Sequence, residues 1–133
     1  CRLIQGLICT SNLKIKLTGD SSLTKRPMKR CITPLSNIGS NFYPKNKTTL
    51  PLTIEGTSLP LAQKHFENLG SAQVKSTICL SALNTPGITT IQATPSRDHT
   101  ENLLKYVKAD IKIQKSKQYT ANQICLLQMT KIY

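Results

Sequence analysis

The feature that most constrains the fold is an internal repeat. When the sequence is shifted by 71 positions, residues 2–10 lie over residues 73–81, and Arg26 lies over Arg97. Both segments carry apolar residues at helical spacing, three or four positions apart. A period of this length is too long for a small solenoid repeat and better suits duplicated α/β subdomains. If the copies are equivalent, one set of paired apolar residues should be buried: Leu3, Leu7, Val74 and Ile78.

Each copy is predicted to run helix, strand, helix, strand, strand. The first strands are expected at 13–17 and 88–92, each leading to a second helix, at about 26–39 and 97–110. "NTPG" before the strand at 88–92 is typical of a turn. The later strands are predicted at "TLPLTIEG", "ADIKIQ" and "NQICLLQ". The stretch "TSLPLAQKHFENLG" has no assignment. The fold class is therefore α/β (α+β).

The second helix of the first copy carries the clearest local signals. Pro27 suits a first helical turn, Gly39 suits the end, and Pro34 predicts a short or kinked helix. In the other copy, Ser96 is the predicted N-cap. The helix at about 26–39 should bury one apolar face, which consists of Met28, Cys31, Ile32, Leu35 and Ile38.

Composition limits the classes of partner. The formal charge is +12, from 18 Lys and Arg against 6 Asp and Glu, which attracts nucleic acid, an acidic membrane surface or phosphorylated metabolites. No stretch approaches the roughly 20 apolar residues of a membrane helix, and no signal peptide is evident, so a cytoplasmic protein is expected. The five cysteines form no C-x-x-C pair, and with only two histidines they predict buried, reduced thiols and no metal site.

The basic stretch "GDSSLTKRPMKR" raises the question of an anion site. In both copies a strand leads through a polar turn to a helix N-terminus, where free N–H groups and the helix dipole favour an anion. Arg26 and Arg97 stand at these matched positions, and a guanidinium suits phosphate or carboxylate. The alternative for either arginine is solvated surface, which is the interpretation for Lys25, Lys29 and Arg30.

Three motifs together carry a family resemblance. "LTGDSSLTKRPMKRCITPLSNIGS", "SAQVKSTICLSALNTPGITTI" and "SRDHTENLLKYVKADI" resemble the N-terminal domain of the EPSP synthase family in its bacterial glyphosate-tolerant branch, over residues 1–114. The resemblance implies two similar domains, each built of three β-α-β-α-β-β units. About one and a half units are then present: a first unit at 1–56, truncated at its start, and a second at about 57–130. Residues 1–133 would be a partial N-terminal domain, without the C-terminal domain.

The resemblance also implies a reaction. The family transfers the enolpyruvyl group of phosphoenolpyruvate to the 5-hydroxyl of shikimate 3-phosphate and releases phosphate, in the shikimate pathway towards chorismate and the aromatic amino acids. It requires no metal or organic cofactor, and neither nucleic acid nor a membrane is a partner. The full-length protein is expected to be a monomer.

The family's binding residues carry over by position. Arg26 matches a phosphoenolpyruvate ligand, and Gln73 a residue that reaches both substrates. The remaining matches, all towards shikimate 3-phosphate, are Ser71, Ala72, Ser96 and Arg97. Helix capping is the alternative for Ser71 and Ser96, and first-turn solvation for Gln73. No catalytic acid or base lies in this chain, no family role matches Lys75 or His99, and the chain alone is expected to be inactive.

Three other functions remain open from the sequence. The sister enzyme that transfers enolpyruvyl to UDP-N-acetylglucosamine shares the fold, although "SAQVKS" and "RDHTE" disfavour it. A basic nucleic-acid-binding module fits the charge, but without Trp and with two Phe the chain has few aromatic platforms for bases. A purely structural α/β fragment is the third alternative.

Overall fold

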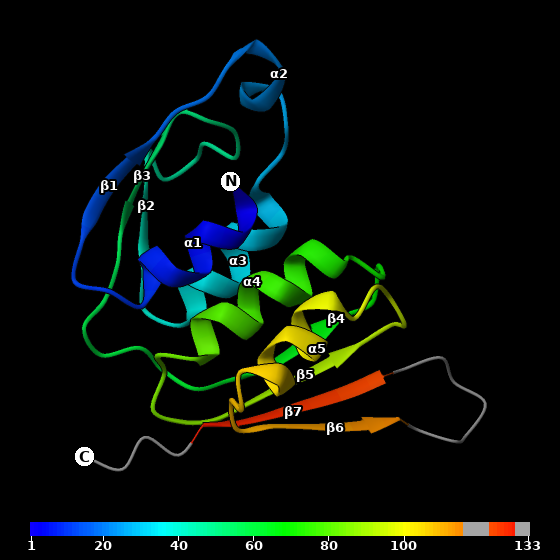
Figure 1. Cartoon of the computed structure of the whole chain (residues 1–133). Helices are drawn as coiled ribbons and strands as arrows, with labels where there is room; N and C mark the ends of the chain where they lie inside the picture. Colours follow the sequence, from blue (N-terminus) through cyan, green and yellow to red (C-terminus); the bar gives the residue numbers. More distant parts are fainter. Residues whose placement is uncertain (116–122, 130–133) are drawn as a thin grey trace.

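The computed structural model describes residues 1–115 and 123–129, and side chains as far as residue 113. Helices and strands are interspersed along the chain (Figure 1). In order, the elements are α1 Arg2–Cys9, β1 Lys14–Leu17, α2 Ser21–Thr24, α3 Lys29–Asn37, β2 Asn41–Tyr43, β3 Leu52–Glu55, β4 Lys64–Glu67, α4 Ala72–Ala82, β5 Gly87–Ala93, α5 His99–Tyr106, β6 Ile111–Lys115 and β7 Gln123–Met129.

The strands form two sheets with corresponding topology. The first has the order β1-β3-β2, and the second has the order β4-β5-β7-β6. β3 lies antiparallel between β1 and β2, as β7 does between β5 and β6, and β4 adds to β5 in parallel. From β4 onward the elements follow the order β-α-β-α-β-β. The predicted order of helix, strand, helix, strand, strand is confirmed in the second copy. The first copy has the same order with the short helix α2 added between β1 and α3, and the mixed fold class is confirmed.

Helix α4 is the centre of the molecule. It contacts α1, α3, α5 and β5, and α1 and α3 lie on the side away from the second sheet (Figure 1). Because neighbours surround it, α4 is buried around most of its circumference, including small polar residues that bond within the helix. Thr77 Oγ1, for example, donates to the Gln73 carbonyl at 2.8 Å, and Ser81 Oγ to that of Ile78 at 2.9 Å.

Helices α1 and α4 occupy equivalent positions in the two copies and pack against each other in the same direction. Near their N-termini Arg2 contacts Gln73, and near their C-termini Asn84 donates to the Thr10 carbonyl. Between these contacts the backbones approach closely at Gly6, where an added Cβ would lie 2.2 Å from the Thr77 carbonyl oxygen. The glycine therefore sets the distance between the helices.

This close contact explains an error in the predicted core. Val74 and Ile78 are buried as expected, but Leu3 and Leu7 are 43% and 44% exposed. Helix α1 instead buries Gln5, Gly6, Ile8 and Cys9. Its leucines face outward because the face that carries the glycine is the one that can approach α4.

Helix α3 follows its predicted stripe more closely than its predicted start. Met28, Cys31, Leu35 and Ile38 are buried, with Ile32 packed against them. The helix is short, with Pro34 inside it, and Gly39 follows its end with a φ of +109° that suits glycine. Pro27 was wrongly placed in the first turn: Met28 is the N-cap, so the proline precedes the helix.

Helix α5 also begins later than predicted. Asp98 rather than Ser96 is the N-cap, and no side chain caps the first turn. The buried face carries Glu101 and Leu104, whereas Leu103 and Tyr106 are 58% and 85% exposed. The shift of 71 positions places Leu35 of α3 over Tyr106 of α5, so a buried residue in one copy corresponds to an exposed residue in the other. The shift of 71 positions also predicts that residues 2–38 superimpose on residues 73–109.

The thiols are mostly buried. Cys9, Cys31 and Cys79 are buried and form no disulfide, as predicted, Cys1 is exposed, and the side chain of Cys125 lies outside the described residues. Burial raises the pKa of the Cys9 thiol to about 11 and also raises the pKa of Cys31. Among the described residues, no helix is long and apolar enough to span a membrane.

Candidate anion-binding site

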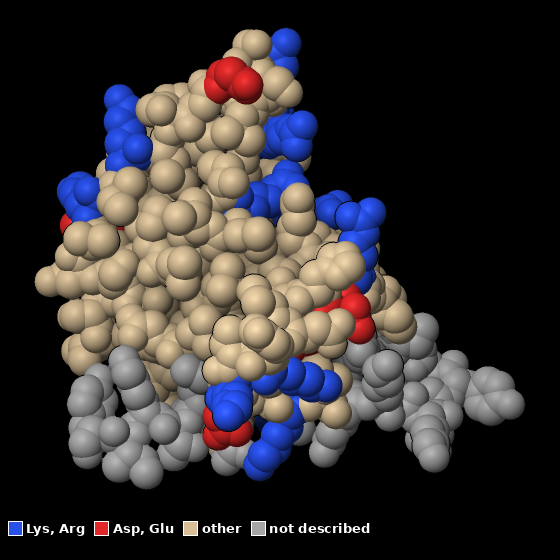
Figure 2. All heavy atoms as spheres, in the orientation of Figure 1, with Lys and Arg blue, Asp and Glu red and all other residues tan. Residues whose placement is uncertain are grey.

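Two cavities open beside the N-terminal end of α4, and Arg2 lines both. The larger, of about 530 Å³, is lined by Arg2, Pro27, Lys29, Arg30, Thr33, Ser71 and Val74. The smaller, of about 120 Å³, is lined by Cys1, Arg2, Leu3, Leu23, Arg26, Met28 and Gln73. Lys and Arg side chains gather along the concave margin between the α2 region and the rest of the molecule (Figure 2). The cavities thus combine cations with the start of a buried helix.

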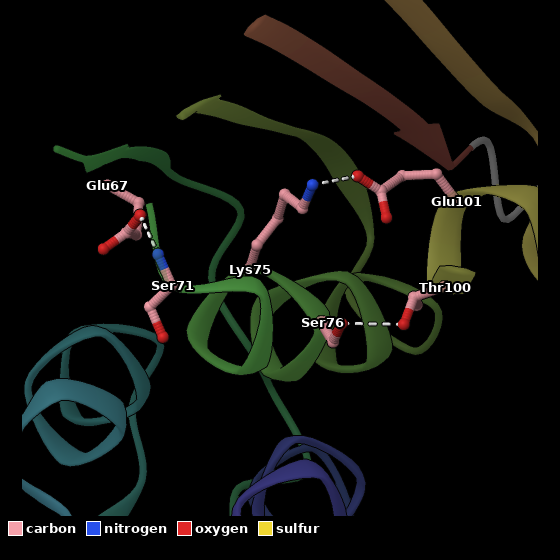
Figure 3. A network of polar contacts seen from close by, with 6 residues as sticks. All are labelled: Glu67, Ser71, Lys75, Ser76, Thr100 and Glu101. Carbon is pink, nitrogen blue, oxygen red and sulfur yellow. Dashed lines mark hydrogen bonds and ion pairs between the residues drawn. The ribbon is translucent and has the colours of Figure 1, made fainter. Parts of the chain in front are cut away.

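The start of α4 is fixed by two side chains. Ser71 is the N-cap, and its Oγ accepts from the Val74 N–H at 3.4 Å. The buried Glu67 carboxylate, at the end of β4, accepts from the N–H groups of Leu69 at 3.2 Å and Ser71 at 2.8 Å (Figure 3). Gly70 permits the turn between them, with a φ of +65°. The N-cap role considered for Ser71 is confirmed, and the serine also faces the larger cavity.

Gln73, in the first turn of α4, is held by Arg2. One guanidinium nitrogen of Arg2 donates to Gln73 Oε1 at 2.5 Å, and the other donates to the Pro27 carbonyl at 2.9 Å. Arg2 therefore joins the first turn of α4 to the turn that contains Arg26. Sequence reasoning missed Arg2, although the shift by 71 positions had laid it directly over Gln73.

Arg26 lies in the turn between α2 and α3, two positions before the N-cap of α3 and not within the helix start as predicted. The turn is ordered on both sides. Asp20 caps α2 by accepting from the Leu23 N–H at 2.7 Å, and the Met28 N–H donates to the Thr48 carbonyl at 2.6 Å. Arg26 and Gln73, the two residues matched to phosphoenolpyruvate, line the same small cavity.

The first turn of α3 adds two cations that sequence reasoning treated as surface. Lys29 and Arg30 are exposed, but both line the larger cavity with Ser71. Cations at a helix N-terminus are disfavoured by the dipole unless an anion is nearby. Because both residues stand at the start of a predicted helix, the sequence contained a signal that they could face an anion.

These cations are free of acidic partners within the described residues. Ion pairs in this part of the chain join Lys14 to Glu55 and Lys75 to Glu101, and no acidic side chain is paired with Arg2, Arg26, Lys29 or Arg30. A cavity edge with cations that are not neutralised by neighbouring carboxylates attracts anions more strongly than a neutralised surface does. The arrangement is suited to a ligand with more than one negative charge.

The remaining matched residues lie at different places. Ala72 is the first residue of α4, beside Ser71. Ser96 and Arg97 lie in the loop before α5 and line neither of the two cavities. Arg97 is exposed, whereas the Ser96 hydroxyl is buried without a hydrogen-bond partner among the described residues. The structure therefore brings together Arg26, Ser71 and Gln73, and leaves Ser96 and Arg97 on a neighbouring loop.

A polar network connects that loop's helix to α4. Lys75 and Glu101 form an ion pair with side chains only 2% exposed, and the hydroxyls of Ser76 and Thr100 are 2.7 Å apart (Figure 3). Both contacts join the first half of α4 to the start of α5. They fix the two segments that carry Ser71 and Arg97 relative to each other. No group of three His, Cys, Asp or Glu in the described part of the chain could hold a metal ion.

The fold defines a class of protein before any closer assignment. It matches the crystal structure of the enolpyruvyl transferase NikO from Streptomyces tendae with a TM-score of 0.56 at 11% identity, over 92% of this chain and 28% of that one. At this identity the match shows the fold alone. The two-sheet arrangement around α4 is therefore the fold of an enolpyruvyl transferase.

Closer comparisons identify the family. The model of the family EPSP synthase (3-phosphoshikimate 1-carboxyvinyltransferase) matches residues 1–129, and the chain belongs to this family. The EPSP synthase structure from Acinetobacter baumannii matches with a TM-score of 0.79 and 31% identity, over 97% of this chain and 29% of that chain.

Curated relatives agree with this assignment. The 3-phosphoshikimate 1-carboxyvinyltransferase of Rhodospirillum rubrum is 42% identical over 88% of this chain and 26% of its own length. That of Petrotoga mobilis is 48% identical over 83% of this chain and 26% of its own. The chain thus spans about a quarter of the length of these relatives.

Proposed function

We propose that the protein to which this chain belongs transfers the enolpyruvyl group of phosphoenolpyruvate to the 5-hydroxyl of shikimate 3-phosphate. The hydroxyl gives up its proton as its oxygen bonds to C2 of phosphoenolpyruvate, and C3 takes up a proton, so that the C2–C3 double bond becomes a single bond. The tetrahedral adduct then loses inorganic phosphate and a C3 proton, which restores the double bond. The names of the relatives support carboxyvinyl transfer to 3-phosphoshikimate, and the donor and the steps are those that the family resemblance implies. The chain would form part of the N-terminal domain, with units at 1–56 and about 57–130.

One observation supports the proposal most directly. Arg26 is more than 40 positions from Ser71 and Gln73 in the sequence, yet the three residues line adjoining cavities together with three further cations. Both substrates are polyanions, and cations and N–H groups fixed before the ligand arrives stabilise charge without reorganising during the reaction. Within this arrangement Arg26 and Gln73 would bind phosphoenolpyruvate.

The shikimate 3-phosphate side would use the other matched residues. Ser71, Ala72 and Gln73 stand at the start of α4, where the helix dipole favours a phosphate. The N–H groups of Ser71 and Val74 are already bonded, to Glu67 and to Ser71 Oγ, so the backbone donors left for a phosphate are those of Ala72 and Gln73. Ser96 and Arg97 would approach the same substrate from the loop before α5. The chain supplies binding groups in this proposal, and no catalytic acid or base is assigned within it. A cytoplasmic location and a monomeric full-length protein remain predictions.

The test is a comparison of acceptors with the full-length protein. Release of inorganic phosphate from phosphoenolpyruvate should require shikimate 3-phosphate, and the enolpyruvyl product should be identified by mass spectrometry. UDP-N-acetylglucosamine should not support release. Activity with the nucleotide sugar in place of shikimate 3-phosphate would contradict the proposal and favour the sister reaction.

A further inference from the structure

The side chain of Arg2 contacts both segments that are matched to phosphoenolpyruvate. It donates to Gln73 Oε1 at 2.5 Å and to the Pro27 carbonyl, next to Arg26, at 2.9 Å. A guanidinium has five N–H donors in a rigid plane, so it can hold two acceptors at a fixed angle. The Pro27 carbonyl thus anchors the guanidinium, and the guanidinium anchors Gln73.

The contact determines which end of the Gln73 amide is available to a ligand. An amide has an acceptor oxygen and a donor NH₂ group, and only the donor suits a phosphate or carboxylate. Because Arg2 donates to the oxygen, it holds that oxygen away from the ligand. Within the described residues the NH₂ group of Gln73 makes no hydrogen bond, so it remains free to donate.

From this geometry we infer that Arg2 is a positioning residue, which orients the Gln73 amide so that its NH₂ group faces the anionic substrate. The inference rests on the proposed function, and it adds a residue to which the family resemblance gives no role. Without Arg2 the amide can rotate, and a carbonyl oxygen turned towards phosphate repels it. Arg2 then acts through Gln73 rather than by touching the substrate.

A double-mutant cycle in the full-length protein tests this mechanism. Arg2→Ala and Gln73→Ala should each raise the KM for phosphoenolpyruvate on the order of tenfold, because each removes the oriented donor. In the Gln73→Ala background, Arg2→Ala should add less than about a twofold effect, since the group it orients is gone. Lys16→Ala is the matched control, because Lys16 is exposed on β1 and its loss removes one positive charge, as Arg2→Ala does. It should leave the KM for phosphoenolpyruvate unchanged.

A second variant guards against loss of folding. Arg2→Lys keeps the charge but cannot hold two acceptors in one plane. When Gln73 is present, it should raise the KM for phosphoenolpyruvate by less than Arg2→Ala does, and in the Gln73→Ala variant it should have little effect. It carries the cycle if Arg2→Ala does not fold. Equal factors for the Arg2 variants with and without Gln73 would overturn the inference, because they would show direct or independent action.

The proposed function can fail separately from the inference. If Gln73→Ala raises the KM but the Arg2 variants behave like wild type, the positioning role is wrong and the proposed function stands. If Gln73→Ala leaves the KM for phosphoenolpyruvate unchanged, the positioning role and the assignment of Gln73 are wrong, whereas the proposed reaction stands. If the full-length protein does not use phosphoenolpyruvate, both the inference and the proposed function are wrong.

Discussion

The buried ion pair between α4 and α5 should respond very differently to single and double substitution. Lys75 and Glu101 have side chains only 2% exposed, so removing one partner leaves a charge in a site without water. Such single losses cost about 3–5 kcal/mol, whereas replacing both partners with apolar residues of similar volume is often neutral or stabilising. Lys75→Met or Glu101→Leu alone should therefore strongly destabilise the α4–α5 contact, and the double variant should recover most of the loss.

Amide hydrogen exchange in the full-length protein measures this locally. If α4 and α5 exchange through a shared opening, a loss of about 3–5 kcal/mol lowers their protection by roughly two to four orders of magnitude. The exposed pair of Lys14 and Glu55, 3.6 Å apart with side chains 63% and 39% exposed, provides the control. Lys14→Met should cost about 1 kcal/mol or less. Equal effects of Lys75→Met and Lys14→Met would refute the argument that the buried pair is desolvated.

Three further predictions concern the site, the packing and the pH response. Arg26→Ala in the full-length enzyme should lower kcat/KM for phosphoenolpyruvate about tenfold to a hundredfold, with Arg26→Lys between, while the exposed neighbour Lys25→Ala changes little in the same steady-state assay. Gly6→Ala should lower the denaturation midpoint, because the added Cβ would lie 2.2 Å from the Thr77 carbonyl oxygen, and overpacking costs about 1–3 kcal/mol; a raised midpoint would contradict the observed helix spacing. Burial lowers the pKa of His65, so the unfolded chain binds more protons than the folded one as the pH drops below about 6.5, and the free energy of unfolding should fall there. In thermal unfolding, His65→Leu should lose less stability than the wild type over the same drop in pH.

The order of elements was predictable because local chemistry determines it. The turn at 84–87, the stripe of α3 and the helix end at Gly39 depend on residues close together in sequence. The site residues around Arg26 and Gln73 came from motif resemblance, and the structure adds that they line a common cavity. Local signals could not give this, since the two residues meet only after α1, α3 and α4 have packed.

The mistakes share a physical cause. Strand β4 was unassigned because it buries His65 and Glu67 and exposes Phe66, at 68%, which reverses the usual apolar alternation. Helix α1 likewise exposes Leu3 and buries Gly6. Hydrophobic periodicity reports which face is apolar, but packing also depends on how closely two backbones can approach and on which polar groups find partners. Where those conditions dominate, the apolar face is not the buried one.

The internal repeat also explains how Arg2 comes to face Gln73. The shift of 71 positions places Arg2 over Gln73 and Gly6 over residue 77, and these equivalent positions are the ones in contact between α1 and α4. Equivalent helices that lie side by side in the same direction bring their first turns together, so both helix N-termini and their first-turn side chains meet at one end. The two copies differ there in chemistry, since one supplies a cationic donor and the other an amide acceptor. Their contact therefore creates an oriented hydrogen-bond donor that neither copy could form alone.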